Sequence, residues 1–289
     1  MDKIRIGFIG AGQVGVTLGA YFAGKGLNIS GYFSRSFNSA QAAAKIVSTQ
    51  AFADLAPFVE ECEMIFITTA DEQIKTVWQE LKKYDLNNKI ICHTSGALAA
   101  DVFEGIAACG AYGCSIHPMY AFAQKNGQTQ GLESCFFALE GNGEYLAEII
   151  SFIKKLGNKY LLIAQDKKAL YHLANVFVAN FVLAILNSGF NCLQSCGVSQ
   201  KETIQALMPL IAANLDNIAQ KGCLESLTGP VERNDLATVK KHLEVIPPQY
   251  SGLYAQLSII LADLAQQKHP ARDYGALVNA LSDYMNKRQ

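Results

Sequence analysis

The chain has 289 residues, half of them apolar, which is enough for one large domain or two moderate domains with their own cores. Its 24 basic and 25 acidic residues leave a net charge of −1, a balance that points to neither a nucleic-acid partner nor an anionic membrane surface. The eight cysteines form no CxxC pair and no zinc-type cluster, which indicates reduced thiols, no metal site and a cytoplasmic protein.

Strands and helices alternate along the first half of the chain. A strand leads directly into a glycine turn at the N-terminus, which is not the pattern of a signal peptide. The predicted strands are 3–10, 27–35, 63–69, 89–94, 111–117, 135–141 and 159–164, and the predicted helices are 12–26, 39–46 (with Ser39 as its cap), 71–84, 98–110 and 143–156. This βαβ spacing predicts an α/β Rossmann domain over residues 1–164, with a mainly parallel sheet and helices on both faces.

Only helical patterns follow the last of these strands. They cover residues 166–196, 199–221, 234–244, 252–267 and 273–287. We therefore expect an all-α C-terminal domain over residues 165–289, with a substrate cleft where the domains meet. The most membrane-like segment is 169–186, but His172, Asn175 and Asn180 interrupt it, and such residues are costly in lipid. A buried helix is favoured over a membrane span.

The sequence GAGQVG matches the dinucleotide-binding pattern between a predicted strand and a predicted helix, the context that makes the match specific. Gly10 would make the tight turn, Gly12 would let the backbone approach a pyrophosphate, and Gly15 would let helix and strand pack closely. The amides of Gln13 and Val14 would point at the phosphates, helped by the helix dipole. A glycine turn without a ligand is the alternative.

The end of the second predicted strand indicates which cofactor is bound. An NAD site usually has an Asp or Glu here to hold the ribose hydroxyls, and this strand ends without an acid. Arg35 can pair with a 2′-phosphate and lie against adenine, while Ser34 and Ser36 donate hydrogen bonds. The sequence predicts NADP over NAD. The alternative is that Arg35 is a solvated surface residue.

Three further strand ends should contribute to the same edge of the sheet, since ligands bind beyond the carboxyl ends of parallel strands. The small residues Thr68, Thr69 and Ala70 would let the nicotinamide half of the cofactor lie on the backbone. Asp71 follows them and is predicted to cap the next helix rather than to take part in catalysis.

Thr94, Ser95 and Gly96 follow the next strand and would place hydroxyl groups near the nicotinamide, unless they form only a polar turn with a helix cap. His117 ends the strand after that. It is a candidate substrate ligand or acid/base, or alternatively a histidine that fixes an irregular loop.

The helix KKALYHLANVFVAN carries a polar stripe of about 60° on an otherwise apolar surface. Hydride transfer to C=O or C=N needs a proton donor, for which we predict His172, with Asn175 orienting the substrate. Lys168 would anchor a substrate carboxylate or lower the histidine pKa by like-charge repulsion. Ser95 and His117 would close the site from the Rossmann side. The alternative is a stripe that only satisfies backbone groups at a domain interface.

A second polar cluster spans residues 228–235. The turn would present Arg233 to an acidic substrate, in this subunit or a partner. The alternative is an ordinary turn in which Asn234 or Asp235 caps the next helix.

Six segments in a fixed order resemble an uncharacterised family of candidate NADP oxidoreductases, which have a Rossmann domain and a helical domain of unknown function. They are GAGQVG, ITTADEQI, HTSGAL, SIHPMYAF, KKALYHLANVFVAN and LTGPVERNDLATVKKHL, and they extend over essentially the whole chain. The architecture is similar to pyrroline-5-carboxylate reductase, ketopantoate reductase, prephenate dehydrogenase and the 6-phosphogluconate dehydrogenase superfamily. That resemblance implies a long helix beside the nicotinamide and a homodimer through the helical domains.

The resemblance does not identify the substrate, because two of these branches place Lys and Asn one turn apart on the long helix. Here His172 lies four residues after Lys168, and the Asn comes at position 175. The sequence thus predicts an NADP-dependent oxidoreductase acting on a small carbonyl, imine or hydroxy compound. The alternative from another class is a non-catalytic NADPH-binding sensor or regulatory protein.

Overall fold

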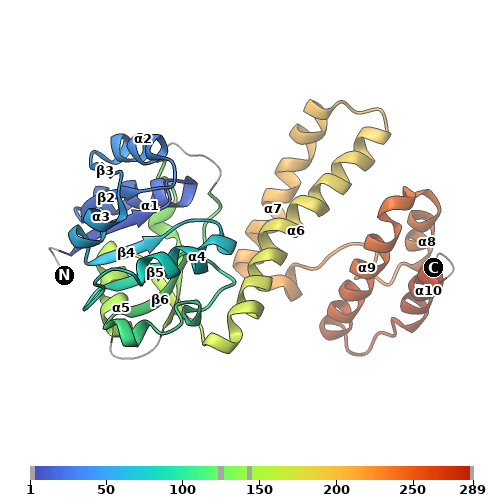
Figure 1. Cartoon of the computed structure of the whole chain (residues 1–289). Coiled ribbons are helices and arrows are strands. Elements are labelled where there is room, and N and C mark those ends of the chain that lie inside the picture. The colour runs from blue at the N-terminus through green and yellow to red at the C-terminus, as the bar shows by residue number, and fades with distance from the viewer. Residues whose placement is uncertain (1–3, 123–126, 142–144, 287–289) are drawn as a thin grey trace. The chain divides into compact units, whose positions relative to one another are not determined.

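The computed structural model describes residues 4–122, 127–141 and 145–286. It divides into two compact units, Met1–Asn180 and Phe181–Gln289 (Figure 1). Strands occur only in the first unit among the described residues, and the second unit is helical. The predicted order of an α/β Rossmann domain followed by an all-α region is confirmed.

Eight strands of the first unit form one sheet in the order β3-β2-β1-β4-β5-β6-β7-β8. They are β1 (Arg5–Ile9), β2 (Asn28–Phe33), β3 (Gln50–Phe52), β4 (Met64–Ile67), β5 (Ile90–His93), β6 (Tyr112–Pro118), β7 (Phe136–Gly141) and β8 (Lys159–Leu162). Every neighbouring pair is parallel except β6 and β7. The carboxyl ends of β1 to β6 therefore meet at one edge of the sheet, as the mainly parallel topology predicts.

Helices cover both faces of this sheet. They are α1 (Gln13–Gly24), α2 (Phe37–Val47), α3 (Leu55–Glu61), α4 (Asp71–Leu81) and α5 (Tyr145–Leu156). Alternate strand residues point to opposite faces. Met64 and Phe66 of β4 therefore join the core under α1, α2 and α5, whereas Ile65 and Ile67 join the core under α3 and α4.

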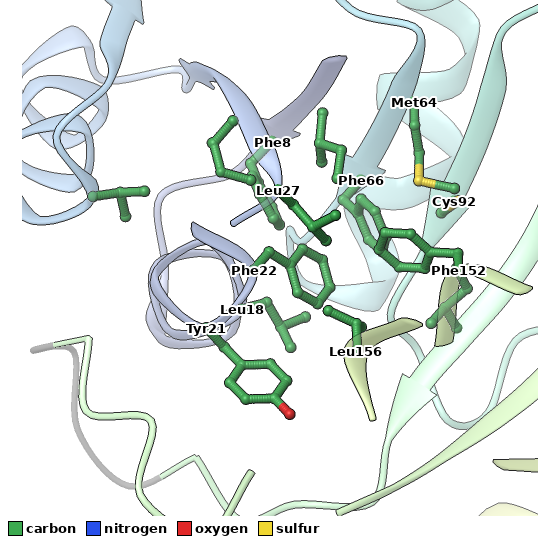
Figure 2. Close-up of a cluster of buried hydrophobic side chains, with 14 of the residues drawn as sticks. Phe8, Leu18, Tyr21, Phe22, Leu27, Met64, Phe66, Cys92, Phe152 and Leu156 are labelled. Carbon is green, nitrogen blue, oxygen red and sulfur yellow. The ribbon is translucent and has the colours of Figure 1, made fainter. Parts of the chain in front are cut away.

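The core under α1 and α5 is aromatic, as Figure 2 shows. Phe22 of α1 packs edge-on against Phe66 of β4 and Phe152 of α5, with ring centroids 5.4 Å and 5.3 Å away. Burying each of these rings contributes about 2–3 kcal/mol. This packing fixes α1, which begins at the glycine turn, against the sheet.

Two local predictions in the first unit are wrong. Instead of one helix over 98–110, two 3-10 helices form, η1 (Ala100–Val102) and η2 (Ile106–Cys109). Gly105 separates them with a φ of 77°, and the Ala100 amide bonds the Glu140 carboxylate at 2.6 Å. Ser36 rather than Ser39 caps α2, since its hydroxyl accepts the Ser39 amide at 3.4 Å. Neither β3 nor α3 was predicted from the sequence.

The long helix α6 (Lys168–Ser195) begins in the first unit and continues into the second. The units divide at Asn180, whereas the predicted boundary after residue 164 lies where strands give way to helices. By length and composition, the helix over Gln165–Ser195 could span a membrane: its most apolar stretch has a mean hydropathy of 1.9, and none of that stretch is buried. The prediction of a buried helix is therefore wrong within the single chain, where Lys168 is the one buried residue of α6. One such helix is weak evidence for a membrane, so the absence of a membrane partner stays a prediction.

The second unit contains the rest of α6 and four further helices. These are α7 (Gln200–Ser226), α8 (Leu236–Val245), α9 (Pro248–Lys268) and α10 (Gly275–Asn286). The last three share a core that includes Val239, Ala255, Ala262, Leu277 and Leu281. Small residues on α9 let these helices approach closely.

The turn before α8 is held from within the second unit. The Glu232 carbonyl accepts hydrogen bonds from the Arg272 guanidinium at 2.7 Å and the Tyr274 hydroxyl at 2.6 Å. Asp235 caps α8, so that part of the alternative interpretation is confirmed. Arg233 is exposed, and its role as a substrate cation stays a prediction.

Candidate nicotinamide-cofactor site

The glycine turn has the geometry that a dinucleotide requires. Gly10 has a φ of 108°, and a Cβ there would lie 2.9 Å from the Thr68 backbone. A Cβ on Gly15 would meet the Thr68 hydroxyl and the Gly10 carbonyl. In contrast, a Cβ on Gly12 would meet no atom within 4 Å. The fold itself thus requires glycine at Gly10 and Gly15, while the space beside Gly12 is open for a ligand.

Helix α1 begins at Gln13, directly after this turn. Gln13 and Val14 form the first turn of α1, the end of a helix whose dipole favours an anion. The Thr68 hydroxyl donates to the Gly10 carbonyl at 2.9 Å and thereby fixes the turn to the end of β4. The Thr68 side chain therefore stabilises the turn and is not evidence for a ligand.

Thr69 behaves differently from its neighbour. Its hydroxyl oxygen is buried and has no hydrogen-bond partner among the described residues. An unsatisfied buried hydroxyl costs about 1–3 kcal/mol, so a bound group that pairs with it is favoured. Ala70 follows it with an exposed, small side chain. These features fit the predicted nicotinamide side of a cofactor.

At the end of β2, Ser34 is half-buried, while Arg35 and Ser36 are exposed. Ser36 is the N-cap of α2, so Arg35 lies in the chain between the carboxyl end of β2 and the N-terminal end of α2. Both features favour an anion. The arrangement fits the 2′-phosphate of NADP.

The loop after β5 is fixed through Ser95, which is 5% exposed. Its hydroxyl donates to the Asp71 carboxylate at 2.6 Å and accepts from the Ala97 and Leu98 amides. Asp71 makes no cap on α4, so that prediction is wrong. Ser95 Oγ is therefore occupied by the chain itself, and half-buried Thr94 is the other hydroxyl of this loop.

Lys168 lies at the start of α6 and is only 2% exposed. Its ammonium group donates to the Ser115 hydroxyl of β6 at 2.9 Å and to the Ser95 carbonyl at 3.3 Å. Burial lowers the Lys168 pKa to about 8, with Glu140 and Asp71 opposing that effect. Lys168 thus links α6 to the loop after β5 and to the middle of β6.

Two histidine rings meet at Gly96, in the loop after β5. A Cβ on Gly96 would lie 2.9 Å from His117 Nε2 and 2.9 Å from His172 Cδ2. His117 Nδ1 lies 2.6 Å from the Tyr171 hydroxyl. Asn175, one turn after Tyr171, donates its side-chain amide to the Tyr171 carbonyl at 2.8 Å. The predicted residues of β6 and α6 therefore gather beside the predicted loop.

Burial also sets the charge of these groups. It lowers the His117 pKa to about 4, and the nearby charge of Lys168 adds to this. The pKa of fully buried His93 is lowered to about 4 for the same first reason. The predicted repulsion by Lys168 thus acts on His117 and His93. Burial raises the Tyr171 pKa to about 12. His117 and Tyr171 are both uncharged near neutral pH.

Several residues that hydrogen-bond around Ser95, Lys168 and His117 were not predicted from the sequence. Tyr171 gave a detectable signal, because it lies three residues after Lys168 and four before Asn175, on the same helix face. The other members, which come from separate strands or helices, are Asp71, His93, Ser115 and Glu140.

A mainly parallel sheet with an open glycine turn, an orphaned hydroxyl and a cluster of polar side chains at one edge is the arrangement of a Rossmann-type domain, and a helical region follows it here. The chain has a Rossmann-like domain matching residues 1–118 and a domain of unknown function, DUF2520, matching residues 135–260. No curated protein matches it.

Solved structures share this fold over nearly the whole chain. A candidate NADP oxidoreductase from Bacteroides fragilis is 21% identical, with a TM-score of 0.73, covering 91% of this chain and 99% of that one. A reductive aminase from Aspergillus terreus in complex with NADPH is 14% identical, with a TM-score of 0.67 and coverages of 98% and 99%. A pyrroline carboxylate reductase from Plasmodium falciparum with NADP bound is 12% identical, with a TM-score of 0.60 and coverages of 93% and 99%.

Proposed function

We propose that the chain is an NADP-dependent oxidoreductase that transfers a hydride between NADPH and a small carbonyl, imine or hydroxy compound. The observation that carries this proposal is that His117 and His172 meet at Gly96, with the Tyr171 hydroxyl against His117, on the same sheet edge as the glycine turn. The NADP(H)-bound reductases of the same fold support it. A protein that only sensed NADPH would need the glycine turn but not this cluster of donors.

The cofactor would supply the hydride, and groups at the glycine turn, after β4 and after β2 would hold the cofactor. Gly12 leaves open space for the pyrophosphate, and Thr69 offers a buried hydroxyl. Arg35, with Ser34 and Ser36, would pair with the 2′-phosphate. This set favours NADP over NAD.

For the substrate, we propose that the two histidines at Gly96 supply the hydrogen bond and the proton that a reduced oxygen or nitrogen needs. Asn175 would orient the substrate with the second hydrogen of its amide. Lys168 already has its partners in Ser115 and Ser95, so we assign it the task of holding α6 and keeping His117 neutral, in place of anchoring a carboxylate.

Titration of NADPH and NADH tests the cofactor assignment. We expect NADPH to bind at least tenfold tighter, because a charge-assisted pair with the 2′-phosphate contributes about 1.5–3 kcal/mol. Arg35→Ala should lose most of that preference, whereas Arg233→Ala, at an exposed arginine of the second unit, should keep it. Tighter binding of NADH by the unaltered chain would contradict the assignment.

A panel of aldehydes, ketones, cyclic imines and hydroxy acids tests the activity. The chain should oxidise NADPH with at least one reducible member or reduce NADP with a hydroxy compound. His172→Ala should then lower turnover far more than NADPH affinity. A chain that binds NADPH, changes its oligomeric state and turns nothing over would support the sensor alternative instead.

We also propose a homodimer through the helical region, in the cytoplasm. Apart from Lys168, no residue of α6 is buried within one chain. Large apolar side chains are exposed along it, including Leu170 at 65% and Val178 at 74%. A second copy would cover this surface. Light scattering should give twice the chain mass, and Val178→Glu should give one chain mass. A monomeric or membrane-pelleted wild type would refute this part.

A further inference from the structure

His117 and Tyr171 form a close pair between β6 and α6. His117 Nδ1 and the Tyr171 hydroxyl oxygen are 2.6 Å apart, and the two rings meet edge to face with centroids 5.7 Å apart. A neutral imidazole has one N–H donor and one nitrogen acceptor. If the hydroxyl donates to Nδ1, the ring proton must therefore lie on Nε2.

Both groups stay uncharged over the neutral range. The His117 pKa is lowered to about 4, and the Tyr171 pKa is raised to about 12, in both cases mainly by burial. Imidazolium and phenolate are therefore both disfavoured at rest. The pair holds a proton between the two rings and carries no net charge.

The opposite edge of the His117 ring faces the loop after β5. His117 Nε2 lies 2.9 Å from the position of the Cβ that Gly96 lacks, and no described residue hydrogen-bonds to it. Gly96 lies at the sheet edge where Rossmann domains bind their ligands. Nε2 is thus the atom of this pair that is available to a ligand.

We propose that Tyr171 and His117 act as a relay that delivers the proton to the substrate; this rests on the proposed function. His117 Nε2 gives its proton to the substrate oxygen or nitrogen while Nδ1 takes the Tyr171 hydroxyl proton. A new O–H or N–H bond forms on the substrate, and the N–H bond at Nε2 and the O–H bond of Tyr171 break. The imidazole is neutral before and after. The transfer leaves the ring proton on Nδ1 and a phenolate at Tyr171. To reset the pair, Nε2 takes a proton from water and Nδ1 returns its proton to the Tyr171 oxygen.

His172 is the competing donor at the same loop. It turns a carbon, Cδ2, toward Gly96. It has no hydrogen-bond partner among the described residues, so no second group is built in to replace a proton that it gives away. His117 has such a group in Tyr171. The relay therefore assigns the proton transfer to His117, and leaves His172 to hydrogen-bond the substrate.

The second unit contains a matched pair for the control. His242 Nδ1 lies 2.9 Å from the Tyr254 hydroxyl, with ring centroids 5.8 Å apart and an edge-to-face angle of 84° against 82° for the first pair. Tyr171→Phe and Tyr254→Phe thus remove the same kind of hydrogen bond from two histidines, of which only one is at the candidate site.

The first readout is NMR of the full chain labelled with [15N]histidine, without cofactor. We expect the His117 ring, identified by the signals lost in His117→Gln, to carry its proton on Nε2. Tyr171→Phe should shift its Nδ1 signal, and Tyr254→Phe should leave it unchanged. A proton on Nδ1 in the unaltered chain would overturn the direction of the relay.

The second readout is turnover with NADPH and a substrate found on the panel. Tyr171→Phe should lower turnover about 100-fold, the usual size of general acid catalysis, and change the NADPH Kd less than twofold. Tyr254→Phe should leave both unchanged. If the unaltered chain is active and Tyr171→Phe is equally active, the relay is wrong but the proposed function stands. If the unaltered chain binds NADPH and turns nothing over, both fail, and the NMR result reports only the hydrogen bond.

Discussion

Replacing Lys168 with methionine should change how the stability of the Rossmann domain depends on pH. Lys168 is 2% exposed, and burial lowers its pKa to about 8 from an ordinary 10.5. Between these pH values the folded chain has released the proton, whereas the unfolded chain still binds it. The free energy of unfolding of the wild type should therefore rise with pH across this window.

The size of the rise follows from the two pKa values. Their difference corresponds to about 3 kcal/mol, since one pKa unit is worth about 1.4 kcal/mol. The Lys168→Met variant has no group that titrates here, so its own curve should lack this rise. The variant also loses the hydrogen bond to Ser115, and this loss should lower its free energy of unfolding by the same amount at every pH. The informative quantity is thus the change with pH of the difference between the two chains.

Urea unfolding between about pH 7 and pH 10 measures this difference. The fluorescence of Trp78 reports the unfolding of the Rossmann domain, because it is the only tryptophan of the chain and is fully buried on α4. Lys167→Met is the matched control, since the Lys167 side chain is 63% exposed. The wild type should gain about 2.5 kcal/mol over Lys168→Met by pH 10 and nothing over Lys167→Met. A constant difference between wild type and Lys168→Met would refute the burial of a charged Lys168.

Other parts of the site give predictions of the same kind. Gly12→Ala should weaken NADPH binding about tenfold at an unchanged Tm, because the added Cβ would meet no atom of the chain but would enter the space proposed for the pyrophosphate. Gly24 has equally open space at its Cβ position, so Gly24→Ala should change neither the Tm nor the NADPH Kd measured by calorimetric titration. Gly96→Ala should lower turnover at least tenfold with little change in the NADPH Kd, because its Cβ would push two histidine rings apart; full activity would contradict their convergence. The pKa of His93 is about 4 in the folded chain, against an ordinary 6.5, so the unfolded chain binds more protons between these pH values. The free energy of unfolding should therefore fall as the pH falls from 6.5 to 4. His93→Gln should remove up to about 3 kcal/mol of this fall, and a urea unfolding profile that depends on pH as in the wild type would contradict the prediction.

The geometry of the candidate cofactor half of the site was predictable from the sequence because its signals are local. Glycine is required at Gly10 by a φ of 108°, and at Gly15 by the approach of the Gly10 carbonyl. These needs recur at a fixed spacing after a strand, so a short pattern reveals them. The absence of an acid beside Arg35 is equally local. All of these residues lie where the pattern predicts, at the carboxyl ends of parallel strands.

For the candidate substrate half of the site, the sequence predicted only that certain residues share one face of a helix. The spacing of Lys168, His172 and Asn175 puts them together, but it does not show what each contacts. The Lys168 partner Ser115 lies 53 residues earlier on β6, and no local pattern links the two. Tyr171 was passed over because a tyrosine in an apolar helix usually belongs to a core. Its hydrogen bond to His117 depends on the tertiary fold.

The predicted helix over 98–110 failed for a related reason. Its composition favours a helix, but Gly105 and Gly110 both adopt positive φ, and the Glu140 carboxylate of β7 binds the Ala100 amide. A carboxylate from a distant strand thus fixes this segment in short 3-10 turns. Tertiary contacts overrode the local propensity.

The buried Lys168 ammonium both holds α6 in place and affects the charge of the nearby histidines. Placing a cation there costs stability, and an apolar residue could hold α6 without that cost. The charge does something that an apolar residue would not do, because it disfavours protonation of His117 and His93. A neutral His117 can accept a proton at one nitrogen while it donates from the other, whereas an imidazolium can only donate. Burial is the larger cause of the lowered His117 pKa, and the Lys168 charge adds to it, so both favour the neutral histidine that the proposed relay needs.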